Sequence, residues 1–207
     1  SLHHKILTMN LLDTDIKNKV LDTVIELLDR HRAEIIQANS LDLKAFNKGD
    51  RAMYDRLVVD NNKVDGMIKA VKEVREQEDP VGKTLSEVER DNGLKIVNKT
   101  APFGTIMIIY ESRPDVTVEA AVLAFKANNK ILLKGGKEAI HTNKVLVDLW
   151  HKALRLNGLS DEYIQLLNLK REETQAFLKN PTQPIDLIVP RGGERLIQFV
   201  KDHAACP

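Results

Sequence analysis

Two pairs of adjacent glycines, each beside basic residues, are the positions in this sequence best suited to hold phosphate. The first pair has a lysine on either side: Lys134, Gly135, Gly136 and Lys137. The second pair comes after an arginine: Arg191, Gly192 and Gly193. Glycine lets the backbone approach a ligand closely, and a lysine ammonium suits phosphate as a point charge. Neither spacing fits a P-loop or a GxGxxG fingerprint, so the repeated pattern, rather than either turn alone, indicates a nucleotide with several phosphates.

A third candidate segment follows the apolar run at residues 106–110. Its proline, Pro114, suits the first turn of a helix, because the missing N–H costs nothing there. The exposed N-terminus of such a helix favours an anion or an oxyanion. We therefore expect Ser112, Arg113 and Asp115 to lie near a substrate or an oxyanion. The same residues equally suit a capped helix start with a surface arginine.

The elements that must position these residues alternate from residue 105 onward. Short, continuous apolar runs predict strands at residues 106–110, 131–133, 163–167 and 185–189. Helical patterns lie between and after them, at residues 116–126, 144–156, 171–178 and 194–203. This alternation predicts an α/β fold with a doubly wound parallel sheet, which usually has more than four strands, so we expect an incomplete domain. Ligands bind beyond the carboxyl ends of such strands, so the three segments should share one edge.

The first hundred residues predict helices and an extended arm. Apolar residues recur at helical spacing in two stripes: Ile16, Val20, Val24, Leu27 and Leu28, and Val64, Met67, Ile68, Val71 and Val74. Between them, residues 39–42 resemble a helix start and residues 48–50 a stop. Alternation at residues 94–100 predicts an extended segment that pairs with residues around 85–88. We expect two units, 1–100 and 101–207, with the charges of the helices forming a solvated surface.

Composition and charge exclude several classes of protein. The chain has 207 residues, of which 43% are hydrophobic and 29% charged, and its net charge is +1. This balance argues against disorder and against a dedicated nucleic-acid binder. We find no membrane-spanning run, signal peptide or metal-ligand set, so we expect no metal. One thiol cannot form an internal disulfide, which predicts a cytoplasmic protein. The single cysteine, Cys206, stands beside Pro207 without the setting that activates a nucleophile.

These motifs together resemble the γ-glutamyl phosphate reductases (glutamate-5-semialdehyde dehydrogenases), a family of the aldehyde dehydrogenase superfamily. The resemblance covers roughly residues 38–207, and its blocks occur in the same order. They are Ala38-Asn39, Asp42, Asp55-Arg56-Leu57, and residues 79–82 (Asp-Pro-Val-Gly), 102–104 (Pro-Phe-Gly), 109–117 (Ile-Tyr-Glu-Ser-Arg-Pro-Asp-Val-Thr), 133–139 (Leu-Lys-Gly-Gly-Lys-Glu-Ala) and 186–193 (Asp-Leu-Ile-Val-Pro-Arg-Gly-Gly).

The resemblance implies an NADPH-dependent oxidoreductase of proline biosynthesis. Such enzymes reduce L-glutamyl 5-phosphate to L-glutamate 5-semialdehyde and release phosphate. A cysteine thiolate attacks the acyl phosphate, and hydride then reduces the thioester. The family's nucleophilic cysteine belongs to a domain well beyond residue 207. We therefore assign no catalytic residue in this chain and expect it to be the N-terminal, cofactor-side part of the enzyme, inactive alone.

The resemblance also implies roles for the glycine-rich turns. Lys134 matches a lysine that contacts the adenosine ribose and its 2′-substituent. Lys137 stands where NAD-preferring relatives often carry a glutamate, and a lysine there would attract the 2′-phosphate of NADP(H). The turn at residues 191–193 matches the helix start near the cofactor pyrophosphate. Residues 111–115 fall close to a segment that helps form the oxyanion hole, although Asp115 is a carboxylate and is not assigned to it.

Two departures and two alternatives accompany the resemblance. Asn128 stands where the family usually has glycine, a substitution that a left-handed helix cap accepts; the missing nucleophile is the other departure. A general NAD(P)-dependent aldehyde dehydrogenase would prefer NAD, and a non-catalytic nucleotide-binding module would act through a partner. The superfamily also implies a homodimer or a higher homo-oligomer, for which residues 94–100 are the candidate arm.

Overall fold

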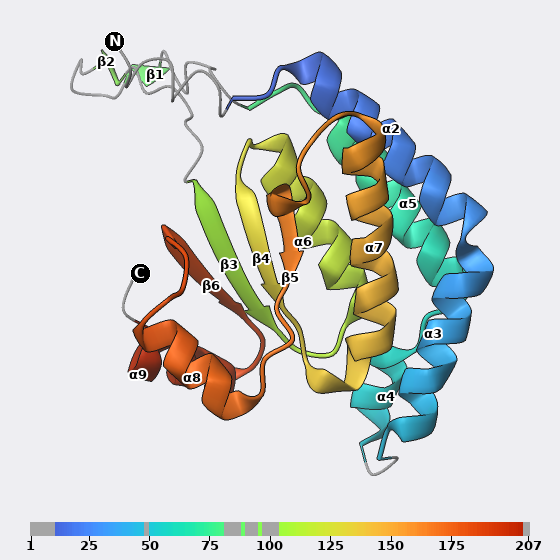
Figure 1. Ribbon diagram of the computed structural model, residues 1–207, viewed down its shortest axis with the longest axis vertical. Coiled ribbons are helices and arrows are strands. Elements are labelled where there is room, and N and C mark those ends of the chain that lie inside the picture. The colour runs from blue at the N-terminus through green and yellow to red at the C-terminus, as the bar shows by residue number, and fades with distance from the viewer. Residues whose placement is uncertain (1–10, 48–49, 81–87, 90–94, 97–103, 205–207) are drawn as a thin grey trace.

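A parallel sheet with helices on both faces forms the centre of the molecule (Figure 1). The structure is a computed structural model that describes residues 11–47, 50–80, 88–89, 95–96 and 104–204. Within these residues the main sheet has four strands in the order β5-β4-β3-β6. They are β3 (Thr105–Tyr110), β4 (Lys130–Lys134), β5 (Ile164–Leu166) and β6 (Leu187–Arg191). The strand order reverses beside β3, because the chain first builds outward to β5 and then returns to add β6 on the other side.

The helices of the α/β part confirm the doubly wound arrangement. They are α6 (Pro114–Lys126), α7 (Ile140–Leu156), α8 (Arg171–Lys179) and α9 (Glu194–His203), with short 3₁₀ turns at Lys137–Ala139 and Asp161–Tyr163. Side chains alternate across β3: Ile108 and Tyr110 join the core beneath α6 and α7, whereas Met107 and Ile109 join the core with α8 and α9. Both faces of the strand are buried, which explains its continuous apolar sequence.

The N-terminal helices form a further layer outside α6 and α7 (Figure 1). They are α2 (Thr14–Arg30), α3 (Arg32–Ala45), α4 (Arg51–Leu57) and α5 (Asn61–Glu76). The two apolar stripes expected from the sequence are confirmed, since all but one of their residues are buried in a core shared with the sheet. The exception is Ile16, at the start of α2.

The helix start expected at residues 39–42 is wrong, because these residues lie inside α3. Their polar side chains are buried and bind other elements instead. The Asn39 amide donates to the Leu57 carbonyl (2.8 Å), and the Asp42 carboxylate accepts from the backbone N–H groups of His141 (3.1 Å) and Thr142 (2.8 Å). Asp42 therefore satisfies free donors at the start of α7 from a distant helix, and α7 begins at Ile140 rather than at residue 144.

One charge of the N-terminal helices, expected to lie on a solvated surface, is buried instead. The Lys17 side chain is fully buried, and its ammonium lies 2.6 Å from the Asp79 carboxylate and 2.7 Å from the Lys126 carbonyl. The Lys126 ammonium in turn donates to Asn18 Oδ1 (3.0 Å). Burial lowers the pKa of Lys126, and the neighbouring Asp79 opposes that shift. These contacts join α2 to the C-terminal end of α6.

The start of β6 differs from the sequence expectation, whereas the end of α6 confirms it. Strand β6 begins at Leu187 instead of residue 185, because the Asp186 carboxylate accepts from the Thr105 N–H (2.8 Å) just before the ladder starts. The strand then runs through Pro190, which an edge strand tolerates. Asn128 has a φ of 60°, which confirms the expected left-handed helix end after α6.

Part of the expected arm lies within the described residues. Strands β1 (Val88–Glu89) and β2 (Lys95–Ile96) pair antiparallel, as the alternating pattern predicted. The rest of that segment, the expected unit boundary at residue 101 and Cys206 lie outside the described residues. Among the residues that are described, no helix is long and apolar enough to cross a membrane.

Candidate functional site

The three segments singled out in the sequence meet at the carboxyl edge of the sheet. Lys134 ends β4 opposite Ile109, and Arg191 ends β6 opposite Tyr110. Because β3 lies between them, the two basic turns flank its end, roughly 10 Å apart across two strand spacings. This edge, where the strand order reverses, is the place where open α/β sheets bind their ligands.

The Lys134 turn is held by the protein's own side chains. A Cβ on Gly135 would lie 2.6 Å from Asn143 Nδ2, and one on Gly136 would overlap the Ser112 hydroxyl. Both glycines are therefore required for packing, whether or not a ligand approaches. The Lys134 ammonium is half-buried and donates to the Gly135 carbonyl (2.7 Å). Burial lowers the pKa of Lys134, and the neighbouring Glu138 carboxylate partly offsets this.

Lys137 is exposed at the start of the 3₁₀ turn that leads into α7. Lys134 and Lys137 thus both belong to the turn that follows β4, and lysine ammonium groups suit phosphate. No described histidine, cysteine, aspartate or glutamate group clusters with metal-ligating geometry.

The Arg191 turn presents its backbone rather than its guanidinium. Arg191 is the last residue of β6, not part of the loop, and its side chain lies 3.4 Å from the Glu119 carboxylate of α6. Gly192 and Gly193 are exposed, and Gly193 caps α9 without a side-chain hydrogen bond. Backbone N–H groups at a helix start suit an anion. The Glu111 carboxylate currently lies 3.4 Å from the Gly193 nitrogen.

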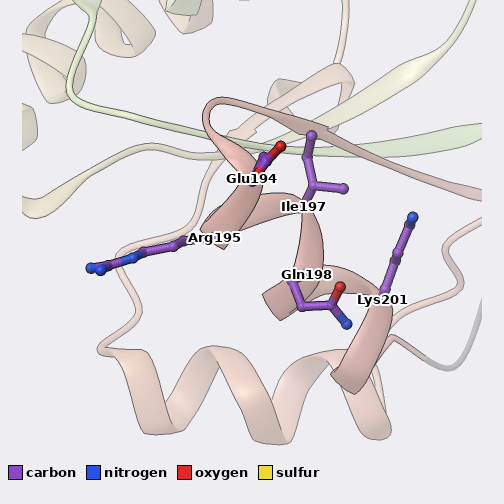
Figure 2. Close-up of a pocket in the computed structure, with 5 residues that line it drawn as sticks. All are labelled: Glu194, Arg195, Ile197, Gln198 and Lys201. Atoms are coloured by element: carbon purple, nitrogen blue, oxygen red, sulfur yellow. The ribbon is translucent and has the colours of Figure 1, made fainter.

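An open pocket adjoins this turn along α9. Its volume is about 420 Å³, and it is lined by Glu194, Arg195, Ile197, Gln198 and Lys201 (Figure 2). Arg195 projects away from the other four side chains. The opposite side of α9 packs on the sheet, so the pocket-lining face is the one left to solvent. Sequence reasoning missed this face, although the charged residues within an amphipathic helix could have indicated it.

The segment after β3 begins α6 as expected. Pro114 occupies the first turn, and Arg113 is the N-cap residue. The Ser112 hydroxyl is buried and donates to the Glu138 carboxylate (2.7 Å), which ties this segment to the Lys134 turn. Arg113 and Asp115 are both half-buried beside it.

A buried hydrogen-bond chain supports the floor of the site. The Tyr110 hydroxyl lies 2.6 Å from Thr117 Oγ1, which donates to Asn143 Oδ1 (2.7 Å). Burial raises the pKa of Tyr110, and the hydrogen bond to Thr117 opposes the shift only in part. The phenol therefore stays neutral and acts as a structural group. The chain links β3, α6 and α7 directly behind Gly135.

Two basic residues of the N-terminal helices also reach this edge, and sequence reasoning did not assign either to the site. Arg56 of α4 lies 3.9 Å from the Glu111 carboxylate. The Lys63 ammonium of α5 donates to the carbonyls of Asp55 (3.3 Å) and Arg56 (2.8 Å). Arg56 belongs to a block that carried the family resemblance, which was the available signal. No sequence signal marked Lys63, because only the packing of α5 beside α6 brings it to this edge of the sheet.

Comparisons with known proteins bear on the fold and on the family resemblance. No family model matches the chain. A γ-glutamyl phosphate reductase from Persephonella marina is 43% identical over 196 residues, which are 94% of this chain and 44% of that protein. The crystal structure of the reductase from Thermotoga maritima superposes with a TM-score of 0.85 at 37% identity and covers 97% of this chain and 49% of that one.

A more distant structure shows the fold alone. A probable aldehyde dehydrogenase from Listeria monocytogenes superposes with a TM-score of 0.73 at 13% identity, over 97% of this chain and 41% of that one. The chain spans about half the length of the curated relatives it matches. The resemblance read from the sequence motifs is thus confirmed: along nearly its whole length the chain is similar to γ-glutamyl phosphate reductases, within the α/β fold of the aldehyde dehydrogenases.

Proposed function

We propose that this chain forms the cofactor-binding part of a γ-glutamyl phosphate reductase. That enzyme would reduce L-glutamyl 5-phosphate with NADPH to L-glutamate 5-semialdehyde and phosphate, as a step of proline biosynthesis. One observation carries the proposal: the Lys134–Lys137 turn and the Gly192–Gly193 turn flank the end of β3 where the strand order reverses. The identity to named reductases supports the choice of substrate.

The residues present at this edge fit NADP(H). The exposed Lys137 and the half-buried Lys134 supply positive charge for a 2′-phosphate, and neither is neutralised by a carboxylate within 4.0 Å in the described part of the chain. The N–H groups at the start of α9 suit a pyrophosphate. When bound, the cofactor supplies the hydride. The Glu111 carboxylate must move aside or be outcompeted at Gly193, because two anions cannot share that position.

The chain's own residues have binding and positioning roles in this proposal. Lys134, Lys137 and the Gly192–Gly193 turn hold the cofactor, and Ser112 fixes the β3–α6 segment against Glu138. The substrate side would lie along residues 111–115, next to the end of β3. No nucleophile is assigned in the described residues. We propose that the protein is cytoplasmic, acts on a small-molecule substrate and binds neither nucleic acid nor a membrane.

The cofactor assignment can be tested by titrating NADPH and NADH against the chain and following cofactor fluorescence. Lys137→Glu should weaken NADPH binding by at least about tenfold, because an attraction becomes a repulsion, while NADH binding changes little. Lys72→Glu, an exposed position of α5, is the matched control and should leave both affinities unchanged. A preference for NADH in the wild-type chain would favour a general NAD-dependent aldehyde dehydrogenase and refute the NADP assignment.

The oligomeric state forms a separate part of the proposal. We propose that the β1–β2 hairpin belongs to an arm that contacts a second copy in a homodimer or higher homo-oligomer. Antiparallel pairing of these short strands is consistent with an extended arm. Light scattering coupled to size exclusion would measure the mass, and replacement of residues 88–96 by a glycine-serine linker should reduce it to that of a monomer. A linker variant that keeps the oligomer excludes the arm.

A further inference from the structure

Arg113 and Asp115 are charged, half-buried side chains at the start of α6. In the described part of the chain, neither side chain forms a hydrogen bond or an ion pair within 4.0 Å, and they do not pair with each other. Half-buried charges normally find hydrogen-bond partners, since their desolvation costs free energy that only a partner offsets. A cation and an anion two residues apart, both partly open to solvent and unpaired within the described part of the chain, are available to a ligand that carries both charges.

Lys63 adds a third charged group near Arg113 and Asp115. Its ammonium donates to the carbonyls of Asp55 and Arg56 instead of pairing with Asp115. It nevertheless lies close enough to both for their charges to act on it. Burial lowers the pKa of Lys63, Asp115 raises it and Arg113 lowers it. The pair therefore sits in a corner between α5 and the start of α6, with an additional fixed cation beside it.

The pair follows the end of β3 in the chain, where the proposed reaction would take place. Ser112 directly precedes Arg113 and is fixed by Glu138, so the backbone that carries the pair is anchored. Pro114 restricts the backbone between the two charged residues. The fold thus fixes the backbone positions of Arg113 and Asp115 relative to each other.

We infer that Arg113 and Asp115 bind the amino-acid end of the substrate, Arg113 its α-carboxylate and Asp115 its α-ammonium. The inference rests on the proposed function and deepens it, because it names the residues that select an α-amino acid over a simple acyl group. A guanidinium presents a planar fork that matches a carboxylate, and a carboxylate accepts readily from an ammonium. Lys63 adds positive charge that favours the α-carboxylate.

The test compares three ligands that differ in one charge each. L-Glutamate carries both α-groups, glutarate lacks the ammonium, and 4-aminobutyrate lacks the α-carboxylate. Binding to the chain is measured by titration with NMR detection. We expect glutamate to bind at least about tenfold more tightly than either analogue, because each analogue leaves one protein charge unpaired.

Variants assign each charge to its residue. Asp115→Asn should weaken glutamate and 4-aminobutyrate by about tenfold but leave glutarate unchanged. Arg113→Gln should weaken glutamate and glutarate by a similar factor but leave 4-aminobutyrate unchanged. Arg51→Gln, on the exposed surface of α4, should alter none of the three affinities. Melting temperatures of all variants establish that they are folded.

The outcomes separate this inference from the proposed function. Absence of glutamate binding in the wild-type chain, or equal losses for all three ligands in both variants, would overturn the amino-acid site. NADPH titration of the same variants should show affinities within about twofold of wild type, since the cofactor contacts other residues. If the crossed pattern appears while NADPH fails to bind, the amino-acid site stands and the cofactor assignment falls.

Discussion

The Ser112 hydroxyl donates a 2.7 Å hydrogen bond to the Glu138 carboxylate and so clamps two turns together at the edge of the sheet. Ser112 follows β3, whereas Glu138 follows β4, and they are 26 residues apart in the sequence. Gly136 lies directly against this pair. This contact, together with the Tyr110–Thr117–Asn143 chain behind Gly135, therefore holds the Lys134 turn against the start of α6.

Gly136→Ala tests this clamp. The added Cβ would overlap the Ser112 hydroxyl and lie 3.0 Å from the Ser112 nitrogen, so the two turns must separate. We expect a loss of about 1–3 kcal/mol in the free energy of unfolding, the usual cost of overpacking. Gly66→Ala is the control, because nothing lies within 4 Å of its added Cβ, and it should stabilise α5 by about 0.5–1 kcal/mol. Urea denaturation measures both; equal effects at the two positions would contradict the clamp.

Glu111→Gln should increase the affinity for NADPH. The Glu111 carboxylate lies near the Gly193 nitrogen and repels an incoming pyrophosphate. Neutralising it should tighten binding by roughly two- to fivefold, as expected for one charge at a helix N-terminus. Fluorescence titration gives the affinity, with Glu73→Gln on the exposed side of α5 as the control. A weaker affinity in Glu111→Gln would show that Glu111 itself contacts the ligand.

The pH dependence of NADPH binding should report Lys134. Burial lowers its pKa, with Glu138 acting in the opposite direction, so its ammonium loses a proton at lower pH than an ordinary lysine does. The group is charged below that pKa and neutral above it, so affinity should fall as the pH rises through it. Titrations from about pH 7.5 to about pH 10 would compare wild type with Lys134→Arg, which stays protonated. Parallel curves for the two proteins would exclude Lys134 as the titrating group.

Asp79→Asn should strongly destabilise the chain. It leaves the fully buried Lys17 ammonium without the carboxylate that lies 2.6 Å away, at a cost of roughly 3–5 kcal/mol. The double variant Lys17→Met with Asp79→Asn should recover part of this loss, because the buried charge is removed as well. Unfolding in urea measures these two variants and the single variant Lys17→Met, and strictly additive effects would show that the pair is not coupled.

Much of the fold could be predicted from local sequence patterns. The stripe from Val64 to Val74 is the buried face of α5, and the apolar runs of β3 and β4 are strands buried on both faces. Periodicity identifies such elements because burial of one face or both imposes it. The glycine pairs at residues 135–136 and 192–193 marked both turns at the ligand edge.

Contacts between distant segments could not be predicted in this way. Asn39 and Asp42 looked like a local helix start, yet they bond to Leu57 and Thr142. A side chain that can cap a helix caps whichever free donors lie nearest in space, and these belonged to another helix.

By itself, the sequence determined the order and type of the elements, the presence of basic diglycine turns and the likeness to a reductase family, because these depend on local patterning and on the residues themselves. The tertiary structure decided which groups face a ligand. It directed the Arg191 guanidinium to Glu119, placed the Glu111 carboxylate at Gly193 and carried Lys63 to the corner beside Asp115. Each of these depends on how separate helices pack against one sheet, and burial and charge pairing act there between residues far apart in the chain.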